Sequence, residues 1–225
     1  MFLMPFTLSA VELKVVTEER PPYVYFSGRQ IVGDATVAVE QILQAANVSY
    51  QINVYPWARS YKLALSQNNI LIYPIIKTPE REPLFHWFCP ILRGHPIYLI
   101  KLSSRTDIDI NSLDDAKRYR IGVSREDWNE HFLVAEGFSA TENLDVSADE
   151  ESNLLQLIAG RVDMILVTED SIKMRMKWLN FSQDLVNRAL DKDFRENKQI
   201  CMAISKQSSE RLLPKIQKVF SAINK

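Results

Sequence analysis

The sequence has few of the residues on which metal sites and disulfide frameworks depend. Its 225 residues include two cysteines and three histidines, and neither a third cysteine nor a suitably spaced carboxylate completes a set of metal ligands. Cys89 and Cys201 are compatible with one disulfide in an oxidising compartment, but both could as easily be free, buried, small side chains. We therefore expect no metal and no cofactor, and the pairing of the two cysteines stays open.

An excess of one charge and a long apolar run are also missing. The chain has 27 Lys and Arg against 28 Asp and Glu, without a long basic run, so we expect no nucleic-acid partner. No stretch approaches the roughly 20 apolar residues that span a bilayer. Residues 1–10 are apolar and end in small residues, which is typical of the last part of a secretory signal, although a native N-terminal arm is the alternative. We exclude this segment from the fold and expect export to the periplasm.

A first series of strand and helix patterns alternates along residues 13–76. Strand patterns cover 13–17, 48–55 and 70–76, and helix patterns cover 35–46 and 58–67. This order predicts a parallel sheet with right-handed crossovers. The strand at 70–76 is apolar enough to be covered on both of its faces.

A second, similar series follows the breaker-rich segment at 91–96, and a final strand and helix are predicted over 200–223. The sequence thus predicts an α/β chain with two lobes and two crossings between them. We assign residues 11–91 to the first lobe, 92–199 to the second lobe with the hinge segments, and 200–225 to a return into the first lobe. A ligand would bind in the cleft between the lobes, which would close by hinge motion.

An arginine follows the predicted strand at 70–76. Ligands of open α/β sheets bind beyond the carboxyl ends of the strands, and the guanidinium of Arg81 could there offer a planar fork to a carboxylate or phosphate. Pairing of Arg81 with Glu80 or Glu82 on the surface is an equally good interpretation.

A second candidate feature is the aromatic-flanked arginine at the start of the helix pattern at 58–67. Our hypothesis is that Trp57 stacks on the ligand and that Arg59 orients it. The alternative is that Trp57 packs at the start of the helix and Arg59 lies on the surface.

Several short motifs occur in a characteristic order that covers nearly all of the chain after residue 10. They are Thr17–Tyr23, Gln30–Asp34, Thr78–Arg81, Phe85–Trp87, Tyr119–Val123 and Gly160–Asp163. In these motifs the sequence resembles the periplasmic solute-binding proteins that serve ABC importers of polar amino acids (solute-binding protein family 3). The resemblance implies the type II periplasmic-binding fold, in which each lobe is a mostly parallel sheet flanked by helices.

The resemblance also implies roles for residues of the first lobe. Arg81 would clamp the α-carboxylate of a ligand, and Thr78 and Ile76 precede it in the same segment. Tyr23 would form an aromatic wall of the cleft. Glu18 is an acid at the end of the first strand and joins the ligand-binding candidates.

In the second lobe, Glu126 and Asp127 stand where the resemblance implies a helix N-terminus that binds the same carboxylate. Thr168, with Glu169 beside it, stands where the family places an acid for the α-ammonium group. The family usually has Gly-Thr or Gly-Ser at the first of these positions. The two acids found there would repel a carboxylate, which favours a cation or a polyol as the solute.

The leading hypothesis is a monomeric binding protein that captures a small polar solute, an amino acid or a related compound, and delivers it to an ABC permease in the inner membrane. A sensory role beside a membrane signalling protein is an alternative. An enzyme on this fold would need a catalytic acid in the cleft, and Glu18, Glu126 and Glu169 form no recognisable pair. We therefore expect no catalysis.

Overall fold

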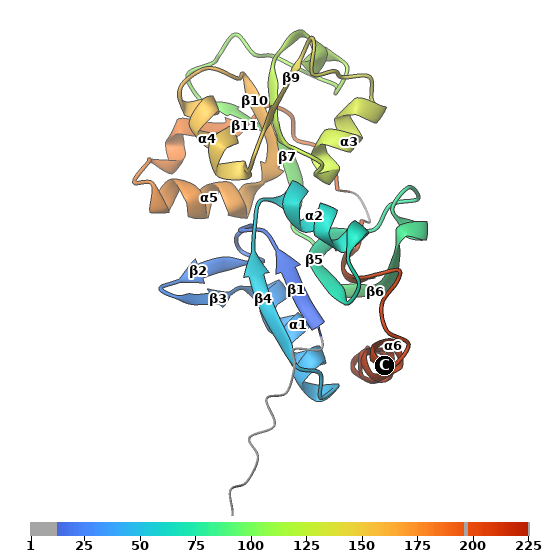
Figure 1. Ribbon diagram of the computed structural model, residues 1–225. Helices are drawn as coiled ribbons and strands as arrows, with labels where there is room; N and C mark the ends of the chain where they lie inside the picture. The colour runs from blue at the N-terminus through green and yellow to red at the C-terminus, as the bar shows by residue number, and fades with distance from the viewer. Residues whose placement is uncertain (1–12, 196–197, 225) are drawn as a thin grey trace, which may run out of the picture.

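The computed structural model describes residues 13–195 and 198–224, and it shows two lobes, one above the other in Figure 1. The predicted signal segment, residues 1–10, lies outside the described residues. Within the described part, each lobe contains one five-stranded sheet. None of the described helices is long and apolar enough to cross a membrane.

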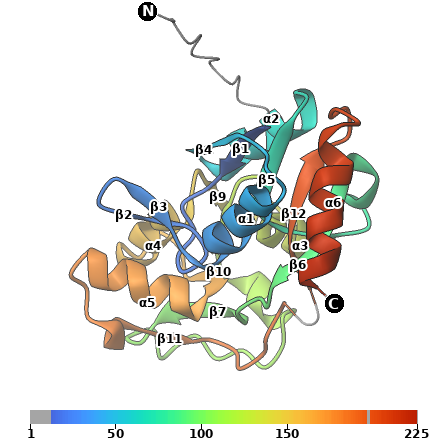
Figure 2. The same cartoon turned by 90° about the horizontal axis from the view of Figure 1, so that it is seen from below.

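The sheet of the first lobe has one reversed strand. Its order is β4 (Tyr50–Val54), β1 (Leu13–Thr17), β5 (Ile70–Ile76), β12 (Ile200–Ser205) and β6 (Phe85–Leu92). The pairings make β12 antiparallel to both of its neighbours, so the other four strands share one direction. Helices α1 (Asp34–Ala45) and α6 (Leu212–Ile223) lie side by side in the core on one face (Figure 2), and α2 (Trp57–Ser66) packs on the other.

The sheet of the second lobe repeats this plan. Its order is β11 (Val186–Arg188), β7 (Ile97–Leu102), β10 (Met164–Thr168), β8 (Ile121–Ser124) and β9 (Leu144–Ser147). Here β7 is the reversed strand. Helix α3 (Trp128–Ala135) packs on one face, and α4 (Glu150–Ile158) and α5 (Glu169–Trp178) pack on the other.

The remaining elements are short. They are the hairpin β2 (Tyr25–Ser27) and β3 (Gln30–Val32), and the 3₁₀ helices η1 (Glu82–Leu84), η2 (Asp115–Arg118) and η3 (Gln183–Leu185). The hairpin extends from the first lobe toward α5, where the Tyr25 ring lies 5.8 Å from the ring of Trp178.

The apolar run Ile70–Ile76 explains why β5 lies inside its sheet. All of its side chains are buried, and they alternate between two cores. Leu71 and Tyr73 pack with α1 and α6, whereas Ile70 and Ile72 pack with α2. A strand that is covered on both faces needs such a continuous apolar run, so the prediction for this segment is confirmed.

The inward face of α2 differs from the expected one. Leu65, an apolar residue of the helix pattern at 58–67 that we expect to point inward, is 45% exposed. Tyr61 and Ala64 are buried instead, at the three-residue spacing that puts side chains on one face of a helix.

A disulfide lies in the first lobe beside the two crossings. Residues 93–96 lead from β6 to β7, and the chain returns after β11 into β12. Cys89 of β6 is bonded to Cys201 of β12, 112 residues later in the sequence. The bridge therefore closes a loop that contains the whole second sheet. The exact lobe limits, 11–91, 92–199 and 200–225, stay a prediction.

Candidate functional site

The segment after β1 runs into the boundary between the lobes, where it carries Glu18, Arg20 and Tyr23, all buried. The start of α1 fixes this segment, because the N–H of Ala35 donates to the Tyr23 carbonyl at 3.1 Å. Gly33, with φ +118°, precedes the helix, and a Cβ there would lie 2.3 Å from the Tyr23 carbonyl oxygen. Only glycine fits at this position, so Gly33 allows the start of α1 to approach the backbone of Tyr23 closely.

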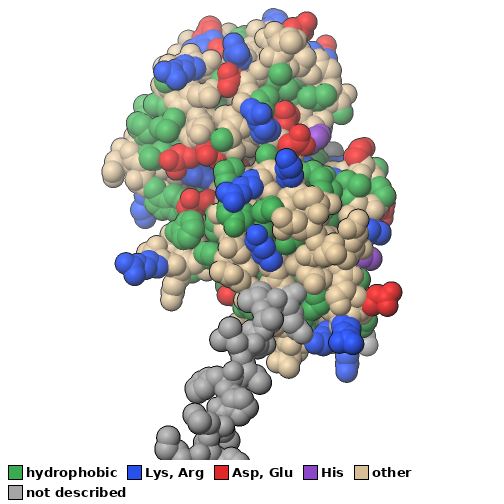
Figure 3. Space-filling view, viewed as in Figure 1, with side chains coloured by type: hydrophobic (Ala, Val, Ile, Leu, Met, Phe, Trp, Pro, Cys, Tyr) green, Lys and Arg blue, Asp and Glu red, His purple; other side chains and the backbone are tan. Residues whose placement is uncertain are grey.

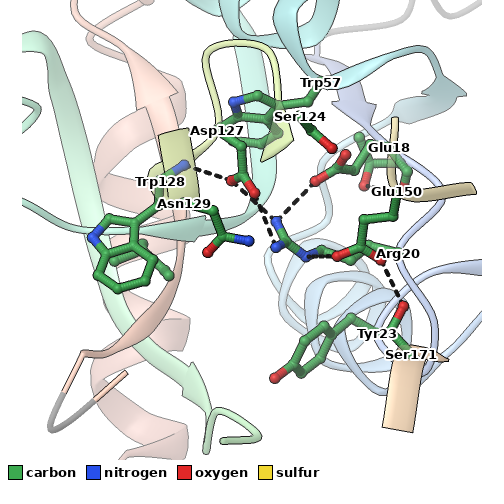
Figure 4. A network of polar contacts seen from close by, with 12 residues as sticks. Glu18, Arg20, Tyr23, Trp57, Ser124, Asp127, Trp128, Asn129, Glu150 and Ser171 are labelled. Atoms are coloured by element: carbon green, nitrogen blue, oxygen red, sulfur yellow. Dashed lines mark hydrogen bonds and ion pairs between the residues drawn. The ribbon is translucent and has the colours of Figure 1, made fainter. Parts of the chain in front are cut away.

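Arg20 is the centre of an ion-pair network that joins the two lobes (Figure 4). Its Nη1 and Nη2 donate to the two carboxylate oxygens of Asp127 at 3.1 and 3.0 Å. Nη1 also donates to Glu18 at 3.1 Å, and Nε lies 3.3 Å from Glu150. Glu18 belongs to the first lobe, whereas Asp127 and Glu150 stand at the starts of α3 and α4 in the second.

Arg175 of α5 extends this network within the second lobe. Its Nε lies 3.6 Å from Glu150 and its Nη1 lies 3.5 Å from Glu151. Its Nη2 donates to the backbone carbonyl of Glu19, in the first lobe, at 2.6 Å. The hydroxyl of Ser171 donates to Glu150 at 2.6 Å. Two arginines, one from each lobe, therefore hold the same carboxylate.

The network shifts the pKa values of Glu18 and Asp127 in opposite directions. Burial raises the pKa of Glu18 to about 8, because desolvation outweighs the attraction of Arg20, and repulsion from Asp127 and Glu150 adds to it. Burial acts on Asp127 in the same sense, but attraction to Arg20 and the hydrogen bonds from Arg20 bring the net pKa below its usual value. Burial thus favours the neutral form of Glu18, whereas Arg20 favours the charged form of Asp127.

A backbone oxygen makes the second link between the lobes. The carbonyl of Glu126, a residue with φ +61°, accepts the indole N–H of Trp57 at 2.7 Å and Nη2 of Arg81 at 3.0 Å. The Arg81 guanidinium lies 5.6 Å from the Trp57 ring centroid and 5.1 Å from that of Tyr61, a range in which cation–π attraction acts.

A small cavity of about 10 Å³ lies at this boundary. Arg20, Trp57 and Arg81 line it from the first lobe, Asp127 lines it from the second, and Arg195 lines it from the returning crossing. A space of this size holds about one water. A solute can therefore bind here only if the lobes separate.

Larger grooves run along the same boundary outside the cavity. One of about 650 Å³ lies between the loop at 78–81 and α3, and one of about 320 Å³ lies between Tyr55 and α4. A third, of about 910 Å³, lies at the crossings around Gly94. The space-filling view shows the two lobes in contact, with acidic and basic side chains along their boundary (Figure 3).

The structure brings several of the predicted site residues of the first lobe together. Tyr23, Trp57, Ile76 and Arg81 all line the cavity. Arg81 is 5% exposed, and no described acidic side chain lies within ion-pair distance of it. The alternative that it pairs on the surface with a neighbouring glutamate is therefore wrong.

Other predicted residues of the first lobe lie at its edges. Glu18 contacts Arg20 beside the cavity and lines the 320 Å³ groove. Thr78 lines the 650 Å³ groove, and its hydroxyl oxygen accepts the backbone N–H of Arg81 at 3.3 Å. Arg59 lies over the Tyr55 ring, 4.1 Å from its centroid, and does not line the cavity.

In the second lobe the structure separates the four predicted residues into two pairs. Glu126 and Asp127 contact the first lobe, as described above. Thr168 is fully buried and caps α5 by accepting the N–H of Ser171 at 3.3 Å. Glu169 pairs with Arg188 at 2.8 Å, away from the cavity. The proposed ligand roles of all these residues stay predictions.

Sequence reasoning missed Arg20, Glu150, Arg175 and Arg195. Arg20 stands just past the end of a predicted strand, which is the same signal that identified Arg81. Glu150 stands at a predicted helix start, which is a common position for an acid. Arg195 lies in a polar segment without a pattern, so no local signal marks it.

The fold resembles several solved binding proteins, although no protein-family model matches the sequence and a search of curated proteins found no match. An ancestral arginine-binding protein bound to arginine superposes with a TM-score of 0.79 at 17% identity, over 96% of this chain and 93% of that one.

Two further structures extend the comparison. The amino acid ABC transporter substrate-binding protein AbpA from Streptococcus pneumoniae, bound to L-arginine, superposes with a TM-score of 0.75 at 19% identity. The match covers 95% of this chain and 89% of that one. A histidine kinase sensor domain superposes with a TM-score of 0.77 at 13% identity, over 94% of this chain and 90% of that one. The chain thus has the two-lobed α/β fold of the periplasmic binding proteins.

Proposed function

We propose that this protein captures a small polar solute, an amino acid or a related compound, between its two lobes and delivers it to an ABC permease. The observation that carries the proposal is the cavity at the interlobe boundary. Charged and aromatic side chains line it from both lobes. A ligand that contacts both lobes shifts their equilibrium toward the closed form, and a transporter can recognise that form.

The internal contacts of the closed chain support a hinge mechanism. Asp127 and the Glu126 carbonyl oxygen bind side chains of the first lobe, and the cavity that they leave is too small for an amino acid. Solute binding would therefore exchange these contacts for contacts with the solute. The hydrogen-bonding groups that now join the lobes, such as Arg81 and Asp127, would then bind the solute.

The disulfide supports a place outside the cytoplasm. Cys89 and Cys201 are joined, and disulfides persist mainly in oxidising compartments such as the periplasm. We propose a periplasmic, monomeric protein. Residues 1–10, which we predict to be part of an export signal, lie outside the described residues.

A sensory role is the second candidate. One compared structure is a histidine kinase sensor domain, with a TM-score of 0.77 at 13% identity. Both roles begin with capture of a solute, so they differ in the partner of the closed form. Reconstitution in vesicles separates them: solute uptake with a permease supports transport, and a change in kinase activity without uptake supports sensing.

A thermal-shift screen against amino acids, polyamines, organic acids and sugars tests solute capture. A solute at about 100 times its Kd should stabilise the chain by about 3 kcal/mol. Trp57→Ala should weaken binding of the hit, because Trp57 lines the cavity. The matched control, Trp87→Ala, changes a tryptophan of β6 outside the cavity lining, whose indole bonds within the first lobe, and should not. If no class of solute shifts the transition, the proposal fails; if a solute is converted to a product, the chain is an enzyme.

A further inference from the structure

Two buried arginines at the cavity have no carboxylate partner in the described part of the chain. Arg81 and Arg195 are 5% and 4% exposed and line the same cavity. Neither forms an ion pair with a described residue, whereas Arg20 beside them is paired with acidic side chains. A buried charge without a partner is costly, so the site holds two cations that an anion would compensate.

Arg195 is positioned in the cleft by neighbours that leave part of it unbonded. Its Nη1 donates to the Tyr23 hydroxyl oxygen at 2.7 Å, and its Nε is buried and has no hydrogen-bond acceptor. The guanidinium passes over Gly94, where a Cβ would lie 2.2 Å from Nη1. Glycine at this point of the crossing therefore makes room for the arginine. Burial lowers the pKa of Arg195, which is the effect expected of an uncompensated cation.

The cavity has more hydrogen-bond donors than acceptors. The Tyr23 hydroxyl oxygen accepts from Arg195 and also from the His95 N–H at 2.6 Å. No acceptor for the proton of this hydroxyl is found among the described residues. On the other side, Trp57 and Arg81 both donate to one carbonyl oxygen, that of Glu126. A ligand that supplies several acceptor oxygens would complete this arrangement.

The acids of the second lobe form ion pairs with other arginines, and no ion pair with Arg81 or Arg195 occurs among the described residues. Both carboxylate oxygens of Asp127 accept from Arg20, and Glu150 lies between Arg20 and Arg175. Arg20 and Arg175 together therefore balance the charges of Asp127 and Glu150, which would otherwise favour a cationic solute. The expectation from the sequence that these acids favour a cation or a polyol does not take Arg20 into account.

We propose that the solute of this cleft is a small dicarboxylate, whose acidic groups bind Arg81 and Arg195, and that Arg20 excludes cationic amino acids. The proposal rests on the proposed function of solute capture and names its substrate class. A carboxylate on Arg81 takes the place of the Glu126 carbonyl oxygen. A carboxylate on Arg195 accepts from Nε and from the Tyr23 hydroxyl.

Calorimetric titration of the full chain with succinate, glutarate, L-glutamate and L-arginine, at matched ionic strength, tests the proposal. At least one dicarboxylate should bind, its monomethyl ester should bind about tenfold more weakly or worse, and L-arginine should not bind.

Arg81→Gln and Arg195→Gln should each weaken binding about tenfold or more. Arg118→Gln is the matched control, because Arg118 is exposed and lies outside the cavity lining, and it should change nothing. If the glutamine variant unfolds, Arg195→Lys provides a second test. It keeps the charge but loses the planar fork of the guanidinium, so it should also weaken binding of the dicarboxylate.

The outcomes separate this inference from the proposed function. If only neutral or cationic amino acids bind, the dicarboxylate assignment is overturned and solute capture stands. If dicarboxylates bind equally well to both glutamine variants, the assignment of the two arginines is overturned. If no solute of any class binds, both proposals fail. Arg20→Gln adds a positive test, because it should allow L-arginine to bind.

Discussion

Arg20 and Asp127, 107 residues apart in the sequence, form a two-pronged ion pair across the lobes, with N–O distances of 3.1 and 3.0 Å. Parallel N–H···O bonds of this kind fix both orientation and distance. Both side chains are almost fully buried. The pair therefore acts as a latch that joins the two lobes.

Arg20→Met should destabilise the closed arrangement. Removing one partner of a buried ion pair leaves carboxylates without a counter-charge, and this costs about 3–5 kcal/mol. Small-angle scattering should report a larger radius of gyration, and chemical unfolding should report the loss of stability. Arg188→Met removes ion pairs with Glu169 and Asp191 that are more exposed to solvent and lie within the second lobe, so it should cost less than the Arg20 substitution and leave the scattering unchanged. Equal effects of the two substitutions would contradict the latch.

Trp57→Phe should loosen the lobes by removing one donor to the Glu126 carbonyl. We expect a loss of about 1–2 kcal/mol, from the hydrogen bond and the smaller ring. Trp87→Phe is a close chemical match, because the Trp87 indole donates to the Glu82 carbonyl at 3.0 Å within the first lobe. Proteolysis of the crossing segment at 93–96 should accelerate in the first variant and not in the second. The same rate in both variants would remove Trp57 from the interlobe contact.

Glu18 should make stability fall as the pH rises. Its pKa is about 8 in the folded chain against an ordinary value of 4.5, so the folded state binds more protons than the unfolded state between these values. The contribution of Glu18 to the free energy of unfolding is then highest below about pH 4.5, falls by a few kcal/mol as the pH rises to about 8, and is constant above it.

Urea unfolding across this pH range, on the parent chain and on Glu18→Gln, measures the effect. The glutamine variant should lose most of the slope. Glu169→Gln is a suitable control, because the hydrogen bond from Arg188 lowers the pKa of Glu169. Its contribution is present above its ordinary pKa and is lost only in more acidic solution. A slope that persists in Glu18→Gln would show that another group titrates.

Reduction of the Cys89–Cys201 bond should destabilise the chain. The bond closes a loop across 112 residues, and cross-links of this length contribute up to about 5 kcal/mol through the entropy of the unfolded chain. Thermal unfolding with and without reductant measures the difference, and a chain with both cysteines changed to alanine should not respond to reductant. Two free thiols in the unreduced, unfolded chain would contradict the bond.

The sequence by itself determined the order of most elements, although the strands β6 and β11 and the hairpin of β2 and β3 were not predicted. The apolar run of β5 and the alternating strand and helix patterns around it report local periodicity, and they predicted an α/β chain with two lobes. The position of Arg81 beyond β5 followed from the same rule. Its burial did not, because a local pattern does not distinguish a side chain in a cleft from one on the surface.

Only the tertiary structure decided how the two lobes meet. The partnership of Arg20 with Asp127 depends on loops from different sheets, and the role of the Glu126 carbonyl depends on a backbone atom that carries no sequence signal. Arg195 enters the cleft because Gly94 of the other crossing leaves space for it. Each of these contacts arises from packing between distant segments, which patterns of neighbouring residues do not encode.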